Sequence, residues 1–126
     1  MEAIRPEGLS PVGPYSPAVR VGPWVFISGQ IALDEQGNIV RSTLEAEIAQ
    51  VLKNLQAVLK AAGLEPSHLV KVTIFLTDMA FFPVVNAAYE KLFSGGPYPA
   101  RETVAVSALP RGARIEISGI ACRPHE

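Results

Sequence analysis

The amino-acid sequence predicts an α+β domain with the element order β-β-α-β-α-β-β, in which two helices cover one face of a mixed β-sheet. Apolar residues recur at steps of three and four over residues 42–62, which is typical of an amphipathic helix. Elsewhere, runs rich in β-branched and aromatic residues lie between turn signals. Because two helices can cover only one face of such a sheet, the other face is expected to meet solvent or a partner.

Length and composition indicate one globular domain over residues 1–126, of which 48% are hydrophobic and 18% are charged. No apolar run approaches the ~20 residues of a membrane span. The N-terminus lacks the basic and apolar regions of a secretory signal, so we expect a cytoplasmic protein without a membrane partner. A formal net charge of -1 provides no cationic field for nucleic acid, and no nucleic-acid partner is expected.

The N-terminal part combines a proline-rich segment with a pair of strands. Four of the first seventeen residues are proline, which predicts a stiff extended arm. The segments AVRVG and PWVFISGQI follow and flank Gly22-Pro23, which predicts two antiparallel strands joined by a turn. A second turn is expected at residues 34–38.

The first helix is expected to begin at Ser42, which forms a capping-box pattern with Glu45, and to end before Gly63. An apolar stripe this broad requires a sheet to pack against. Its members are Ile48, Val51, Leu52, Leu55, Val58, Leu59 and Ala62.

The second half is predicted to contain a strand at residues 69–77, a helix ending near Phe93, and two final strands at residues 102–108 and 113–123. We expect the final strands to be joined by a turn over LPRG, where Pro110 suits the second turn position. The inner face of the second helix is expected to hold Val85, Ala88, Tyr89 and Leu92.

The strand at residues 24–30 has apolar residues on both of its predicted faces. Strict alternation places Val25 and Ile27 on one side and Trp24 and Phe26 on the other. A second apolar face favours a homo-oligomer, and the alternative is a single aromatic stripe at a strand edge.

Four separated motifs resemble the RidA/YjgF family: GPYSPA (13–18), FISGQI (26–31), VNAAYEKLF (85–93) and PARETVAVSALPRGARIEISGIA (99–121). The resemblance covers roughly residues 4–123. It implies a chorismate-mutase-like fold and a homotrimer with ligand clefts between subunits. The subgroup with the arginine is similar to enamine/imine deaminases, which hydrolyse 2-aminoacrylate and 2-iminobutanoate to 2-oxo acids and ammonia without a cofactor.

Arg101 and Glu116 are the catalytic candidates for such a reaction. A guanidinium can hold the substrate carboxylate through two parallel hydrogen bonds, which suits Arg101. A carboxylate beside the C=N carbon can orient and deprotonate a water molecule, which suits Glu116. In the competing interpretation, Arg101 pairs with Glu102 or is solvated, and Glu116 reaches solvent or pairs with Arg114.

The relative placement of these residues depends on the register of the last two strands. A tight turn over residues 109–112 predicts that Arg101, Thr103 and Glu116 share one sheet face. The Cα atoms of Arg101 and Glu116 would then lie roughly 13 Å apart, and their side chains could bracket a small molecule.

The resemblance also makes Tyr15, Ser28, Gly29 and Asn86 candidates for lining the ligand site. Ser28 and Asn86 are equally compatible with a structural role, since short polar side chains often bond to backbone. Many bacterial relatives have cysteine where this chain has Thr103. The backbone carbonyl of Thr103 is therefore the group expected to contact the substrate.

The leading hypothesis is a cofactor-independent deaminase that removes imines released by pyridoxal-phosphate dehydratases. The alternative is a trimeric small-carboxylate-binding or regulatory module, because a shared fold does not guarantee a shared activity. A ribonuclease or translation inhibitor has less support, since no aromatic and basic strand indicates an RNA surface. No metal is expected, because His68 and His125 are too few and too distant to form a site.

Overall fold

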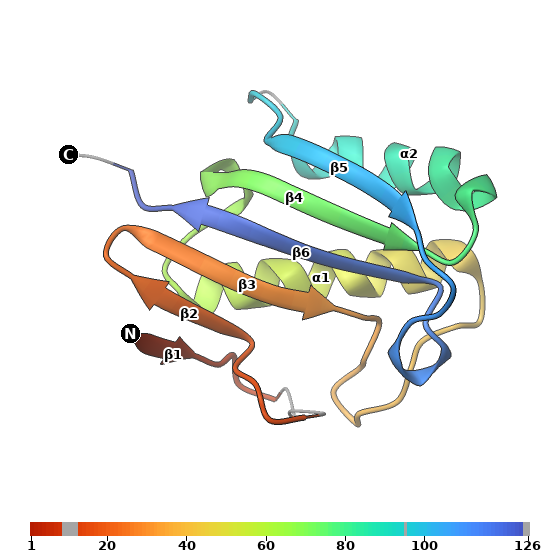
Figure 1. The fold of residues 1–126 in the computed structure, drawn as a ribbon, viewed down its shortest axis with the longest axis horizontal. Coiled ribbons are helices and arrows are strands. Elements are labelled where there is room, and N and C mark those ends of the chain that lie inside the picture. The colour runs from red at the N-terminus through yellow and green to blue at the C-terminus, as the bar shows by residue number, and fades with distance from the viewer. Residues whose placement is uncertain (9–12, 95, 125–126) are drawn as a thin grey trace.

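The computed structural model describes residues 1–8, 13–94 and 96–124 of the chain. Within them, a six-stranded sheet carries two α-helices on one face (Figure 1). The elements are β1 (Glu2–Ile4), β2 (Ala18–Val21), β3 (Trp24–Gln30), α1 (Leu44–Ala61), β4 (Leu69–Leu76), α2 (Phe82–Leu92), β5 (Ala100–Ala105) and β6 (Ile115–Cys122). The α+β class and the predicted order are confirmed, with β1 as an additional first strand.

The sheet is mixed, with the strand order β1-β2-β3-β6-β4-β5. Only β4 and β5 run parallel, and the other neighbouring strands are antiparallel. The prediction that the last two strands form a hairpin is wrong, because β4 lies between β5 and β6. Residues of β6 alternate between buried and half-buried, as expected for a central strand, whereas β5 is largely exposed and forms an edge.

Helix α1 supplies a large part of the core and packs against β3 and β6. The Oγ1 atom of Thr43 accepts a hydrogen bond from the N–H of Ala46 at 3.0 Å, so Thr43 is the N-cap and the predicted Ser42 is not. Gly63 follows the helix with a φ of 76°, as its position predicts. The predicted stripe is buried in full: Ile48, Val51, Leu52, Leu55, Val58, Leu59 and Ala62.

Helix α2 follows a short 3₁₀ turn and covers the sheet near β4 and β5 (Figure 1). Asp78 caps the 3₁₀ turn, since its Oδ1 accepts from the N–H of Ala80 at 2.9 Å. Val85 and Tyr89 are buried, and the other two predicted inner residues, Ala88 and Leu92, are partly buried against the core.

In the part of the chain that the structure describes, no helix covers the other face of the sheet, and we call it the open face. Trp24 and Phe26 lie on it with exposed fractions of 42% and 43%, whereas Val25 and Ile27 are buried beneath the helices. The predicted alternation is therefore confirmed.

Glu2–Ile4 are extended, as predicted, and they also pair with β2 as strand β1, which was not predicted. Residues 9–12 of the predicted arm lie outside the described residues. Within the described ranges, neither helix has the length and apolar character needed to cross a membrane.

Candidate functional site

The two catalytic candidates lie on opposite faces of the sheet. Arg101 on β5 stands opposite Val72 of β4, which in turn stands opposite Gly119 of β6. Glu116 stands opposite Phe75, three residues further along β4. Because successive residues of a strand alternate faces, the predicted shared face is wrong. Across β4, Glu116 is level with Val104, whereas the predicted hairpin pairs it with Ala105. This difference of one residue places Glu116 on the face opposite to Arg101.

Arg101 points to the helix-covered side, where α2 holds its guanidinium in a fixed direction. Its Nη1 donates a hydrogen bond to Oδ1 of Asn86 at 2.8 Å. Its Cζ lies 4.9 Å from the ring centroid of Tyr89 and 5.5 Å from that of Phe82. These stacked contacts and the hydrogen bond define the orientation of the planar group. Glu102 pairs instead with Lys71, with an Nζ–Oε1 distance of 2.9 Å.

A hollow of about 340 Å³ lies beside this guanidinium, and Asn86, Tyr89, Pro99 and Arg101 are among its lining residues. Burial raises the pKa of the Tyr89 hydroxyl to about 12, against a lowering effect of Arg101. That hydroxyl is buried without a hydrogen-bond partner among the described residues. The phenol therefore remains neutral beside the cation, and its ring provides the contact surface.

Phe82 and Tyr89 are site residues that the sequence reasoning missed. Together with Asn86 they occupy positions i, i+4 and i+7 of a helix, so all three lie on one face of α2. The spacing alone therefore provides a signal that these aromatic side chains accompany any ligand contact made by Asn86.

Thr103 lies two residues beyond Arg101 and shares its face, away from Glu116. The N–H of Val106 donates to the carbonyl of Leu76 at 2.8 Å, so the backbone of Val106 faces β4. Because backbone direction alternates along a strand, the carbonyl of Thr103 faces the free edge of the sheet. The Oγ1 atom of Thr103 is buried without a partner among the described residues.

Glu116 occupies a second hollow on the open face, of about 420 Å³. Tyr15, Gly29, Ile31, Pro110 and Arg111 line it together with Glu116. Burial raises the pKa of the Glu116 carboxyl, because a partly dry environment disfavours the charged form.

Gly29 creates the space for this carboxylate. A Cβ atom at position 29 would lie 2.6 Å from Cδ and 2.9 Å from Cγ of Glu116, which is closer than real Cβ atoms approach. The candidates Tyr15, Gly29 and Glu116 are thus brought together. Arg114 does not pair with Glu116, since its Nε bonds to Oε1 of Glu47 at 2.7 Å.

Ser28 has partners within the protein. Its Oγ donates to the carbonyl of Ser16 at 2.6 Å, and its N–H donates to the carbonyl of Pro17 at 2.9 Å. Both bonds fasten the segment that carries Tyr15 to β3. The structure thus gives Ser28 a local structural task next to the Glu116 hollow.

Among the residues that the structure describes, no three His, Cys, Asp or Glu side chains gather in a way that could hold a metal ion. His68 instead accepts a hydrogen bond at Nδ1 from the N–H of Glu65, at 3.0 Å. His125 lies outside the described residues.

Comparisons with known proteins give consistent matches. The family model described as Endoribonuclease L-PSP matches residues 6–123. The chain is 51% identical to protein DfrA of Myxococcus xanthus, with 87% of this chain and 86% of that protein covered. It is 47% identical to mouse 2-iminobutanoate/2-iminopropanoate deaminase, with coverages of 87% and 82%. The solved structure of Escherichia coli TdcF with bound serine superposes with a TM-score of 0.93 at 32% identity and covers 98% of this chain and 100% of TdcF.

Proposed function

The chain belongs to the RidA/YjgF family, which the Endoribonuclease L-PSP model describes. On that premise we propose that it is a hydrolytic deaminase that converts 2-iminobutanoate and 2-iminopropanoate to 2-oxo acids and ammonia. One observation carries the proposal: the chain has both an oriented guanidinium, that of Arg101, and a carboxylate, that of Glu116, whose pKa is raised by burial in a hollow. A raised pKa makes the ionised carboxylate a stronger proton acceptor, as a general base requires.

In the proposed reaction, Arg101 holds the substrate carboxylate and the carbonyl of Thr103 accepts a hydrogen bond from the imine nitrogen. Glu116 orients a water molecule and takes its proton while the water oxygen bonds to the C=N carbon. Return of that proton to nitrogen gives a carbinolamine. Transfer of the remaining hydroxyl proton to nitrogen, as the C–N bond breaks and the C=O bond forms, releases ammonia and leaves the 2-oxo acid. Water is the only co-reactant, and no oxidant or reductant is required.

The two hollows of one chain face opposite sides of the sheet, so they cannot bracket one small molecule. Strand spacing and residue rise place the Cα atoms of Arg101 and Glu116 roughly 14 Å apart. We therefore propose that the Arg101 edge of one chain meets the Glu116 face of another in a homotrimer. The apolar open face around Trp24 and Phe26 supports such an assembly. Sedimentation at about three times the mass of one chain is expected, and a stable monomer would contradict the shared cleft.

The activity test couples a threonine dehydratase to this protein and follows 2-oxobutanoate and ammonia. We expect release well above the spontaneous hydrolysis measured without the protein, with no added metal or cofactor. Glu116→Gln serves as the matched control, because it preserves shape but cannot accept the proton. Equal release with wild-type protein, with the control and with no protein would rule out the proposed activity.

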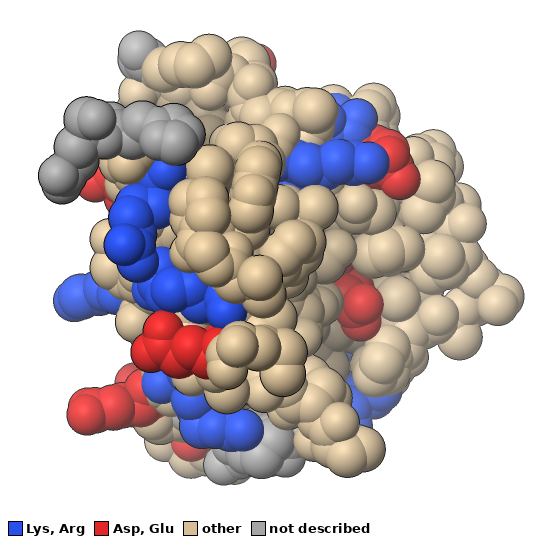
Figure 2. All heavy atoms as spheres, turned by 60° about the vertical axis from the view of Figure 1, so that its left-hand side comes forward, with Lys and Arg blue, Asp and Glu red and all other residues tan. Residues whose placement is uncertain are grey.

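A binding or regulatory module remains the second candidate. The observation in its favour is the Arg101 hollow, which presents an oriented guanidinium to an anion without Glu116, next to the acidic side chain of Glu90 in the same lining. The two functions separate in one experiment, because a binding module retains its affinity for 2-oxobutanoate and shows no turnover. A ribonuclease has weaker support. On the side of the molecule drawn in Figure 2, acidic and basic side chains are interspersed on a largely uncharged surface, whereas an RNA-binding surface is expected to be predominantly basic.

A further inference from the structure

The loop between β5 and β6 forms one wall of the Glu116 hollow, through Pro110 and Arg111. Its backbone is strained, because Arg111 has a φ of 59° and a ψ of 21°, a conformation that residues with side chains rarely adopt. Strain of this kind persists only where the surroundings hold it in place. The hydrogen bonds made by this loop therefore identify the residues that hold Arg111 in its strained conformation.

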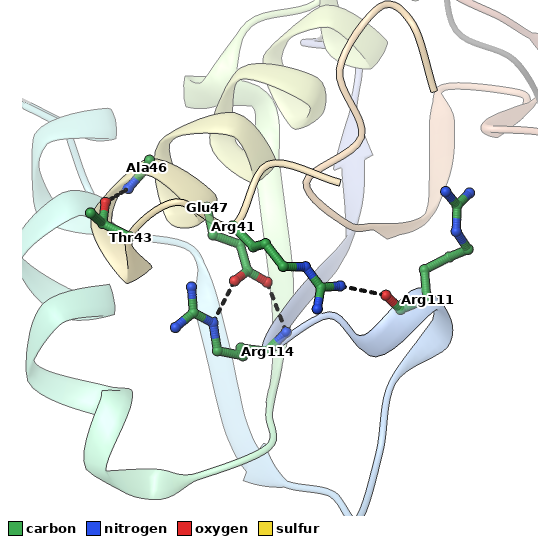
Figure 3. A network of polar contacts seen from close by, with 6 residues as sticks. All are labelled: Arg41, Thr43, Ala46, Glu47, Arg111 and Arg114. Carbon is green, nitrogen blue, oxygen red and sulfur yellow. Dashed lines mark hydrogen bonds and ion pairs between the residues drawn. The ribbon is translucent and has the colours of Figure 1, made fainter. Parts of the chain in front are cut away.

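Arg41, which precedes α1, holds the strained residue directly (Figure 3). Its Nη2 donates a hydrogen bond to the carbonyl of Arg111 at 2.6 Å. The contact is close, since a Cβ atom at Gly112 would lie 3.1 Å from the same nitrogen. The side chain of Arg111 also holds the loop to the segment before α1, because its Nη2 donates a hydrogen bond to the carbonyl of Gly37 at 3.2 Å.

A second attachment fastens the end of the loop to the first turn of α1. The buried carboxylate of Glu47 accepts from the N–H of Arg114 and from its Nε, both at 2.7 Å (Figure 3). Arg114 precedes Glu116 by two residues, so this pair fixes the start of the strand that carries the carboxylate. Thr43 caps the same turn and makes it a stable platform.

We propose that Arg41 is a positioning residue for Glu116: by holding the carbonyl of Arg111, it keeps the loop in place as a wall of the hollow and limits the access of bulk water to the carboxylate. The inference rests on the proposed function. Arg41 is distinguished from Glu47 by its exposure, because removing an exposed side chain leaves the core intact, whereas removing the buried Glu47 carboxylate would disturb the core and leave the half-buried Arg114 without its partner.

The consequence for pH dependence has a definite sign. Burial raises the pKa of Glu116 because it disfavours the charged form. A loosened wall would admit water and lower this pKa toward its ordinary value. Since a general base acts when deprotonated, the acid limb of the kcat/KM profile should move to lower pH, while a more mobile water lowers kcat.

Arg20 provides a control for the loss of an arginine-to-carbonyl bond away from the hollow, and it differs from Arg41 in being half-buried and in pairing through Nε with Glu2 at 3.2 Å. Its Nη2 donates to the carbonyl of Ala62 at 2.6 Å, which is the same kind of bond at the opposite end of α1. We expect Arg41→Gln to lower kcat about 5- to 20-fold and to shift the acid limb to lower pH, with KM within about 2-fold because Arg101 is untouched. Arg20→Gln should change thermal stability but should leave both kcat and the acid limb of the kcat/KM profile unchanged. Arg41→Lys should restore part of the wild-type profile, since one donor reaches the carbonyl.

Two outcomes would overturn the inference: an Arg41→Gln profile identical to wild type, or equal changes of kcat and acid limb in both arginine variants. A direct titration of Glu116, by NMR of ¹³C-labelled glutamate carboxyls, distinguishes this failure from failure of the proposed function. If wild type hydrolyses no imine but the Glu116 titration still moves down in Arg41→Gln, the loop contact stands and the deaminase proposal fails. If wild type is active and the titration does not move, the positioning role fails alone.

Discussion

The Arg101 hollow and the Glu116 hollow are built by different means. Side chains hold the guanidinium: the amide of Asn86 bonds to it, and the rings of Tyr89 and Phe82 flank it. Backbone shapes the Glu116 hollow, through the absent Cβ of Gly29 and the strained loop at residues 110–112. An anchor must present donors in one direction, whereas a base needs space and limited water. With the roles proposed above, we expect substitutions near Arg101 to act on binding and those near Glu116 to act on turnover.

The largest effect is expected for Glu116→Gln, which preserves shape and removes the proton acceptor. We expect kcat for 2-iminobutanoate to fall about 100- to 10,000-fold. The affinity for 2-oxobutanoate, measured by calorimetry, should stay within about 3-fold of wild type because the anchor is unchanged. A variant that retains most of its turnover would show that another group activates the water.

Arg101→Ala tests the other hollow and should act chiefly on binding. Loss of a charge-assisted pair in a partly dry site is expected to lower kcat/KM about 30- to 1000-fold. Arg101→Lys should recover only part of this, because an ammonium cannot reproduce the planar fork or the stacking on Tyr89 and Phe82. The measurement is steady-state kinetics on variants whose oligomeric state matches wild type. Unchanged kinetics for Arg101→Ala would show that the substrate carboxylate is held elsewhere.

Local patterns predict where the elements lie, since periods of about 3.6 and 2 residues report burial within each segment. The place of β6 between β3 and β4 was not predictable in the same way, because strand pairing joins segments far apart in the sequence. The candidate site likewise has features that local patterns predict and features that long-range strand pairing decides. Motifs identify Arg101 and Glu116, but the face that each occupies depends on a register that one inserted strand alters. Helical spacing alone could have identified Phe82 and Tyr89 beside Asn86.

Gly29→Ala tests whether backbone shape governs the Glu116 hollow. The new methyl group would overlap the carboxylate and force Glu116 to rotate away. We expect kcat to fall about 10- to 100-fold with KM changed by less than about 3-fold. Circular dichroism and sedimentation should remain those of wild type. A fall in affinity for 2-oxobutanoate at constant kcat would contradict the division between binding and turnover.

The aromatic contacts of Arg101 predict a smaller effect that separates ring from hydroxyl. Tyr89→Leu removes the stacking surface and should raise KM about 3- to 10-fold. Tyr89→Phe retains the ring and deletes a hydroxyl without a partner among the described residues, so its KM should stay within about 2-fold of wild type. Equal increases in the two variants would assign the contribution to the hydroxyl.

The smallest effect is expected at Thr103, where only the backbone is asked to contact substrate. Thr103→Val replaces a buried hydroxyl that lacks a partner among the described residues with a methyl group of similar size. Because an unsatisfied buried hydroxyl is destabilising, the free energy of unfolding should stay equal or rise by about 1 kcal/mol. The backbone carbonyl remains at the free edge of β5, so kcat/KM should remain within about 2-fold of wild type. Chemical denaturation and steady-state kinetics of the same preparation measure both. A large loss of activity with unchanged stability would assign the substrate contact to the hydroxyl and would remove the proposed role of the carbonyl.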